Sequence, residues 1–176
     1  MTCAIPRAFR SRRFDAKPHP LSGLRIGASV DFGYAAVSSS VRSAFASAVD
    51  VLADCGACIS EDTPALDPQI LEHTLKPIAF IEQAAAAGGK TAEDLADSEA
   101  DYRKVVSAGR RYSGTDYIEA GYRRGQACGA FQKLFDRVDA LVTPTVAVTA
   151  FEAGKIGVAS VDGRVVDPHL GWSPFS

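Results

Sequence analysis

The sequence has few cysteines and histidines and no long apolar run. Four cysteines in 176 residues are too few for the disulfide framework of a secreted protein, so a cytoplasmic location is expected. The longest uncharged apolar stretch, residues 140–151, contains a proline and is too short to span a bilayer. A net charge of −2 gives no overall attraction to nucleic acid or to an anionic membrane. With 47% hydrophobic and 23% charged residues, the composition favours one globular domain.

Residues 1–20 differ in composition from the rest of the chain. They contain five basic residues, one acidic residue and three prolines, and they lack the apolar core of a secretion signal. We therefore predict a basic, proline- and arginine-rich tail over residues 1–20 and a single folded domain over residues 21–176. An organellar presequence is the alternative interpretation of the tail.

The first part of the domain has the pattern of a strand–helix–strand unit. Residues 24–29 form a short apolar run that predicts a buried strand. Ser38 is placed to cap a helix that ends near Cys55 and Gly56, and its apolar face contains Val41, Phe45, Ala48, Val49 and Leu52. Residues 58–61 predict a second strand, parallel to the first through a right-handed crossover.

The middle of the chain is predicted to be helical. A helix begins at Asp67-Pro68, is kinked or interrupted at Pro77 and ends at Gly88-Gly89, and two more cover residues 99–110 and 116–137. The expected apolar face of the last helix comprises Tyr117, Gly121, Ala127 or Cys128, Phe131, Leu134 and Phe135. Residues 140–142 form a third strand that ends before Pro144. This order of elements predicts an α/β fold, and three strands make so thin a sheet that we expect the fold to be incomplete.

Two short motifs suggest a bound group but lack the rest of their pattern. Cys55 and Cys58 have the spacing of a redox or zinc pair. However, Cys55 follows a helix C-terminus, where the dipole disfavours a thiolate, and no second ligand pair is present. We predict that both are small buried residues beside a turn. The sequence from Gly88 to Thr91 resembles the end of a phosphate-binding loop, but Ala84 stands where that loop needs glycine. No cofactor and no metal site are expected.

The best candidate site follows the third strand. Thr143, Pro144 and Thr145 come directly after its carboxyl end, where open α/β sheets bind ligands. Their two hydroxyl groups and the apolar residues that follow could line a small-molecule pocket, so we predict that these three residues bind substrate. The alternative is a loop whose threonines only satisfy local backbone groups.

Two long segments resemble the amidase signature family. They are LSGLRIGASVDFGYAAVSSSVRSAFASAVDVLADCGA near the start and TDYIEAGYRRGQACGAFQKLFDRVDALVTPTVAVTAFEAGKIG further on. The resemblance covers residues 21–176. It implies an α/β fold with a mixed sheet flanked by helices. It also implies hydrolysis of carboxylic amides by a serine nucleophile, a bridging serine and a lysine base.

The residues that the family uses for catalysis have no counterpart in this sequence. It contains no stretch like GGSSGG, and none of its six lysines has the family's catalytic context. Ser38, Ser39 and Ser40 are explained by helix capping and lack a glycine-rich elbow. We therefore expect the C-terminal portion of an amidase, from a truncated or split reading frame, with no catalytic residue and no activity of its own.

The resemblance also indicates which branch and which partners to expect. The segment LKPIAFIEQAAAAGGK lacks the NLxRxDGxRYG pattern of the tRNA-dependent amidotransferase A subunit, so a general amidase fits better. The expected partners are a small-molecule amide in the whole protein and either a second copy of the chain or a complementing N-terminal half. Two other functions stay open: a non-catalytic interaction module or decayed half-domain, and a thiol-redox protein built on Cys55 and Cys58.

Overall fold

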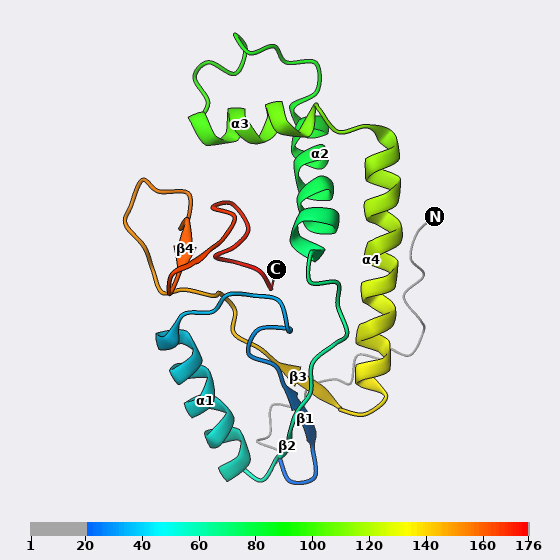
Figure 1. The fold of residues 1–176 in the computed structure, drawn as a ribbon, viewed down its shortest axis with the longest axis vertical. Coiled ribbons are helices and arrows are strands. Elements are labelled where there is room, and N and C mark those ends of the chain that lie inside the picture. The colour runs from blue at the N-terminus through cyan, green and yellow to red at the C-terminus, as the bar shows by residue number, and fades with distance from the viewer. Residues whose placement is uncertain (1–20, 176) are drawn as a thin grey trace, which may run out of the picture.

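The structure is a computed structural model, and it describes residues 21–175. A three-stranded sheet lies at one end of the molecule, a group of helices at the other, and an irregular C-terminal segment between them (Figure 1). In chain order the elements are β1 (Arg25–Ala28), α1 (Ser39–Asp54), β2 (Cys58–Glu61), the π-helical turn η1 (Leu71–Leu75), α2 (Lys76–Ala87), α3 (Ala100–Gly109), α4 (Gly114–Phe135), β3 (Ala140–Val142), β4 (Ser160–Val161) and β5 (Arg164–Val165).

The sheet has the strand order β2-β1-β3, and both pairings are parallel. Ile26 in the central strand is aligned with Ile59 on one side and Ala140 on the other. The predicted strand–helix–strand unit and the predicted third strand are therefore confirmed. Over residues 21–175 the antiparallel pairing is confined to a separate hairpin of β4 and β5, which the sequence analysis did not predict.

Helix α1 begins and ends as its sequence predicts. The Ser38 hydroxyl accepts a hydrogen bond from the Val41 amide at 3.4 Å, and Gly56 follows the helix with φ +94°. Glycine reaches this left-handed conformation without the steric cost of a Cβ. The apolar face is covered only in part, because α1 has no fully buried residue and Ala48 is exposed.

The predicted helix around Pro77 is divided into two geometries. Residues 71–75 form a π-helical turn, and the α-helical pattern begins at Lys76, so that Pro77 lies in the first turn of α2. A proline is tolerated there because the first amides of a helix have no intrahelical acceptor. The helix ends at Gly88 with φ +60°, as predicted.

Helices α2 and α3 pack closely at Gly109. A Cβ at this position would lie 2.0 Å from the carbonyl oxygen of Phe80 and 2.9 Å from the Ala84 side chain. Nearby, Ala87, Leu95 and Val106 form a buried cluster beneath Tyr102. Only a residue without a side chain allows the two backbones to approach this closely.

The expected apolar face of α4 is partly wrong. Ala120 and Leu134 are its fully buried residues, whereas Tyr117 and Phe135 are exposed. The helix also starts earlier than predicted, at Gly114. Ser113 and Asp116 form a reciprocal capping box before it. None of the helices in residues 21–175 combines the length and the apolar character needed to cross a membrane.

Candidate functional site

The C-terminal segment folds back over the loop that follows β1. The Tyr34 hydroxyl donates a hydrogen bond to the Pro174 carbonyl at 2.5 Å, and Arg164 Nη2 donates to the Tyr34 carbonyl at 3.2 Å. Asp162, in the turn between β4 and β5, accepts a hydrogen bond from the Ser39 amide at 2.7 Å. These contacts hold together segments that are more than 120 residues apart in the chain.

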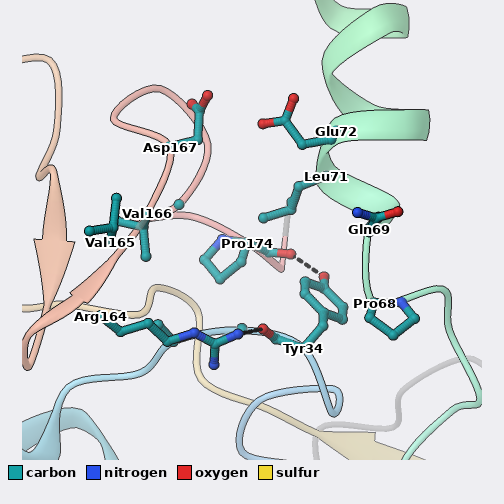
Figure 2. A pocket seen from close by; sticks show the side chains of 13 residues that line it. Tyr34, Pro68, Gln69, Leu71, Glu72, Arg164, Val165, Val166, Asp167 and Pro174 are labelled. Atoms are coloured by element: carbon teal, nitrogen blue, oxygen red, sulfur yellow. Dashed lines mark hydrogen bonds between the residues drawn. The ribbon is translucent and has the colours of Figure 1, made fainter.

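These segments, the residues just before η1 and the first residues of η1 line a cavity of about 200 Å³ (Figure 2). Its wall combines apolar and polar side chains. Arg164 lies on one side of it, Glu72 and Asp167 lie on the opposite side, and Tyr34 lies between Arg164 and Gln69. The lining residues are Tyr34, Ala35, Ala36, Pro68, Gln69, Leu71, Glu72, Arg164, Val165, Val166, Asp167, Gly171 and Pro174. Its volume lies below the range of about 300–1,000 Å³ that is usual for ligand pockets, so the cavity can hold only a small group.

A cluster of charges closes one side of the cavity. Lys76 Nζ lies 2.7 Å from Asp167 Oδ2 and 3.1 Å from Glu72 Oε1 and Oε2. Burial alone would lower the pKa of Lys76, but hydrogen bonds and charge from both carboxylates raise this pKa above its usual value. The lysine is therefore held in its protonated, cationic form.

Asp167 also orders the loop that follows it. Its Oδ1 accepts hydrogen bonds from the amides of His169 at 2.8 Å and Leu170 at 3.0 Å. Burial alone would raise the pKa of this carboxyl group, but the Lys76 hydrogen bond and the two amides lower it below its usual value. One carboxylate thus connects α2 to the C-terminal loop and fixes the conformation of that loop.

The predicted substrate-binding residues do not line this cavity. Thr143 and Pro144 follow β3 directly, and the Thr143 hydroxyl is buried with no hydrogen-bond partner among the described residues. Pro144 is buried and Thr145 is exposed. Ala147, shortly after them, donates a backbone hydrogen bond to the Trp172 carbonyl at 2.9 Å. Their role in substrate binding stays a prediction.

Four residues of the cavity and its neighbouring charge cluster were missed by the sequence analysis. Lys76 and Glu72 have the i,i+4 spacing of a helical ion pair, so their contact could have been predicted from the sequence. Nothing local indicates that Asp167 joins them from 91 residues away. Tyr34 lies between the predicted first strand and the helix capped by Ser38, in a segment for which the sequence analysis predicted no role.

The structure corrects the interpretation of the cysteine pair. Cys55 and Cys58 are both exposed, not buried as predicted. Cys55 directly follows the end of α1, and Cys58 begins β2, which is an edge strand of the sheet. Across residues 21–175, no group of three or more His, Cys, Asp or Glu side chains is placed to hold a metal ion. Ser38 caps α1 as predicted.

Comparison with known proteins identifies the family. The sequence matches the family described as Amidase over residues 7–167. The chain belongs to the amidase family. An amidase of Pseudomonas putida is 28% identical over 160 residues, which are 89% of this chain and 33% of that protein.

Two solved structures have the same fold as this chain. A bacterial aryl acylamidase of the amidase signature family superimposes on 88% of this chain with a TM-score of 0.74 at 21% identity. A 6-aminohexanoate cyclic dimer hydrolase superimposes on 90% of it with a TM-score of 0.64 at 20% identity. These matches cover 34% and 36% of the two solved chains, so this chain spans about a third of the length of its relatives. The predicted amidase-signature fold is confirmed.

Proposed function

We propose that this chain is the C-terminal portion of an amidase that hydrolyses the C–N bond of a small carboxylic amide. The observation that carries the proposal is the family match over residues 7–167. In this reaction a serine hydroxyl attacks the amide carbonyl, and the amine or ammonia leaves with a proton. Water then cleaves the ester of the acyl-enzyme, which releases the carboxylic acid and the free serine.

The nucleophile, the bridging serine and the lysine base are proposed to lie in another part of the amidase. A lysine acts as a general base when its surroundings lower its pKa, whereas the two carboxylates beside Lys76 raise the pKa of its ammonium group. The Ser38 hydroxyl is engaged in capping α1. The protonated state of Lys76 and the capping role of Ser38 support a chain that has no catalytic residue of its own.

The contribution of this chain is proposed to be a wall of the substrate site. Thr143, Pro144 and Thr145 at the end of β3 are the residues that we propose to contact the amide, and the cavity beside Tyr34 adds a second polar surface. The solved relatives named above are an aryl acylamidase and a 6-aminohexanoate cyclic dimer hydrolase, which supports a small amide as substrate. The proposed location is the cytoplasm, and the proposed partner is a complementing N-terminal half of the amidase.

The test measures amide hydrolysis by the chain alone and with its proposed complement. We expect the purified 176-residue chain to cleave no acyl p-nitroanilide and to take no label from a serine-reactive fluorophosphonate. Co-expression with an amidase segment that carries the lysine and the Ser/Gly-rich signature is expected to restore both. Labelling of a serine in the chain alone would contradict the assignment of catalysis to another segment. If neither the chain alone nor the co-expressed pair hydrolyses the amide or is labelled, a non-catalytic interaction module would be favoured.

A further inference from the structure

Helix α4 exposes an apolar seam on the side opposite its buried residues. Ile118 is 55% exposed and Tyr122 is 69% exposed. Together with Gly125 and Gly129 they follow a spacing of four, three and four residues, which places them along one face of the helix. In Figure 1 this helix lies along the outer edge of the molecule. Two large apolar side chains in water at this spacing are typical of a helix–helix contact surface.

The glycines of this seam are not required by packing within the chain. A Cβ added at Gly125 or Gly129 would meet nothing within 4 Å. Glycine inside a helix is unfavourable relative to alanine, because it gives the unfolded backbone more freedom. The two glycines leave the C-terminal half of the seam without side chains. In the N-terminal half, the side chains of Ile118 and Tyr122 project from the helix. The seam is therefore shaped to accept an antiparallel copy of itself.

We propose that two copies of the chain associate through α4, packed antiparallel about a two-fold axis between Gly125 and Gln126. This symmetry places Tyr122 of each copy over Gly129 of the other, so that the large residue fills the space that the glycine leaves. In such an interface each contact occurs twice, since residue i of one copy meets residue j of the other and the reverse. The inference concerns assembly and does not depend on amide hydrolysis.

Charges beside the seam support a second copy as the partner. Glu119, Gln126 and Lys133 lie seven residues apart on one flank, and all three are exposed. Within residues 21–175 neither the Glu119 carboxylate nor the Lys133 ammonium forms a salt bridge. They are about 21 Å apart along the helix, at 1.5 Å per residue. Antiparallel packing brings Glu119 of each copy beside Lys133 of the other and Gln126 beside Gln126.

The first test is sedimentation velocity of the full chain as a function of concentration. A single pair of helices is a small interface, so we expect a reversible monomer–dimer equilibrium in the micromolar range. A monomer at every concentration would overturn the proposal. The variant Gly129→Gln is expected to abolish the dimer and leave the helix intact, because its side chain enters open space in the monomer. Ala85→Gln, on the exposed side of α2, is the matched control.

Charge reversal distinguishes this geometry from non-specific association. Glu119→Lys and Lys133→Glu each replace two attractive pairs per dimer by two repulsive ones, so each is expected to weaken dimerisation by at least about tenfold. The double variant restores opposite charges and is expected to dimerise as the unmodified chain does. An equimolar mixture of the two single variants is expected to form a heterodimer.

The control for net charge is Glu93→Lys, at an exposed position between α2 and α3, and circular dichroism verifies that each variant is folded. Two results would overturn the proposal. One is dimerisation of the single variants that equals that of Glu93→Lys. The other is open-ended aggregation that none of the α4 substitutions changes.

Discussion

The Lys76 ammonium lies 2.7 Å from the Asp167 carboxylate, which is 91 residues further along the chain. Lys76 stands at the start of α2 and Asp167 begins the C-terminal loop, so this ion pair joins the helices to the segment that closes the cavity. The two side chains are 22% and 14% exposed. Solvent therefore screens this pair less than a surface pair, and loss of one partner leaves the other in a poorly solvated position.

The variant Asp167→Asn is expected to lower the free energy of unfolding by about 2 kcal/mol. The reason is that Lys76 keeps its charge and loses the nearer of its two carboxylate acceptors. The change is measured by urea denaturation at neutral pH. Glu72→Gln is the matched control. Its carboxylate is 53% exposed, and the loss is expected to stay below about 1 kcal/mol. Equal losses in the two variants would contradict a dominant role for Asp167.

The same ion pair predicts a loss of stability in acid. Because the pKa of Asp167 is lower in the folded chain than its ordinary value of 3.8, the unfolded chain binds a proton at higher pH than the folded chain does. The contribution of Asp167 is therefore complete above pH 3.8 and is lost as the pH falls through the folded pKa. The difference in unfolding free energy between the unmodified chain and Asp167→Asn should shrink over this acidic range. A constant difference would contradict the proposed linkage.

The elements predicted correctly are those whose signals are local. The three strands of the sheet and α1 follow from apolar runs, the Ser38 cap and Gly56, all of which are read within a few residues. The contact of Lys76 with Asp167 has no local signal, because it depends on how the chain returns after β3. The hairpin of β4 and β5 was missed because each of its strands has two residues, too few for a pattern.

The prediction of the buried face of α4 was only partly correct, because large apolar residues occur on two different faces of this helix. Tyr117 and Phe135 are large and apolar, so periodicity alone assigned them to the core. In the structure α2 and η1 pack against α4, and the buried residues of α4 are Ala120 and Leu134. Which face is buried is decided by neighbours that are distant in the sequence. The exposed aromatic residues and the glycines of α4 therefore carry information about assembly that helical periodicity does not reveal.

Tyr34 is expected to ionise only at strongly alkaline pH. Burial raises the pKa of its hydroxyl group from 10.0 to about 12. The ultraviolet difference spectrum between the unmodified chain and Tyr34→Phe should show one phenolate that forms near pH 12. Since the folded chain holds this proton more tightly than the unfolded chain, stability should fall between about pH 10 and 12. A phenolate that forms near pH 10 would contradict burial of Tyr34.

The hydroxyl of Tyr34 also has a structural contribution that is separate from its titration. It donates to the Pro174 carbonyl, and Pro174 is fully buried. Tyr34→Phe leaves that carbonyl without this donor and is expected to cost about 1 kcal/mol in unfolding free energy at neutral pH. Tyr112→Phe, at a tyrosine that does not line the cavity, serves as the control for loss of a phenol. Equal stability of the two variants would contradict the contribution of the Tyr34 bond.

Two glycine substitutions separate backbone propensity from packing. Gly109→Ala is expected to destabilise the chain by about 2 kcal/mol, because the new Cβ would lie 2.0 Å from the Phe80 carbonyl oxygen and α3 must move away from α2. Gly121→Ala in α4 is expected to stabilise it by up to about 1 kcal/mol, since its Cβ meets nothing within 4 Å. Helix propensity alone predicts a gain for both substitutions.

Urea denaturation of the two glycine variants at low protein concentration, where the α4 seam is unpaired, measures the difference directly. Opposite signs are expected, because steric overlap at Gly109 exceeds the gain in propensity whereas nothing opposes that gain at Gly121. A stabilised Gly109→Ala variant would mean that α2 and α3 separate at little cost. The close approach of these two helices would then not be what requires glycine at position 109.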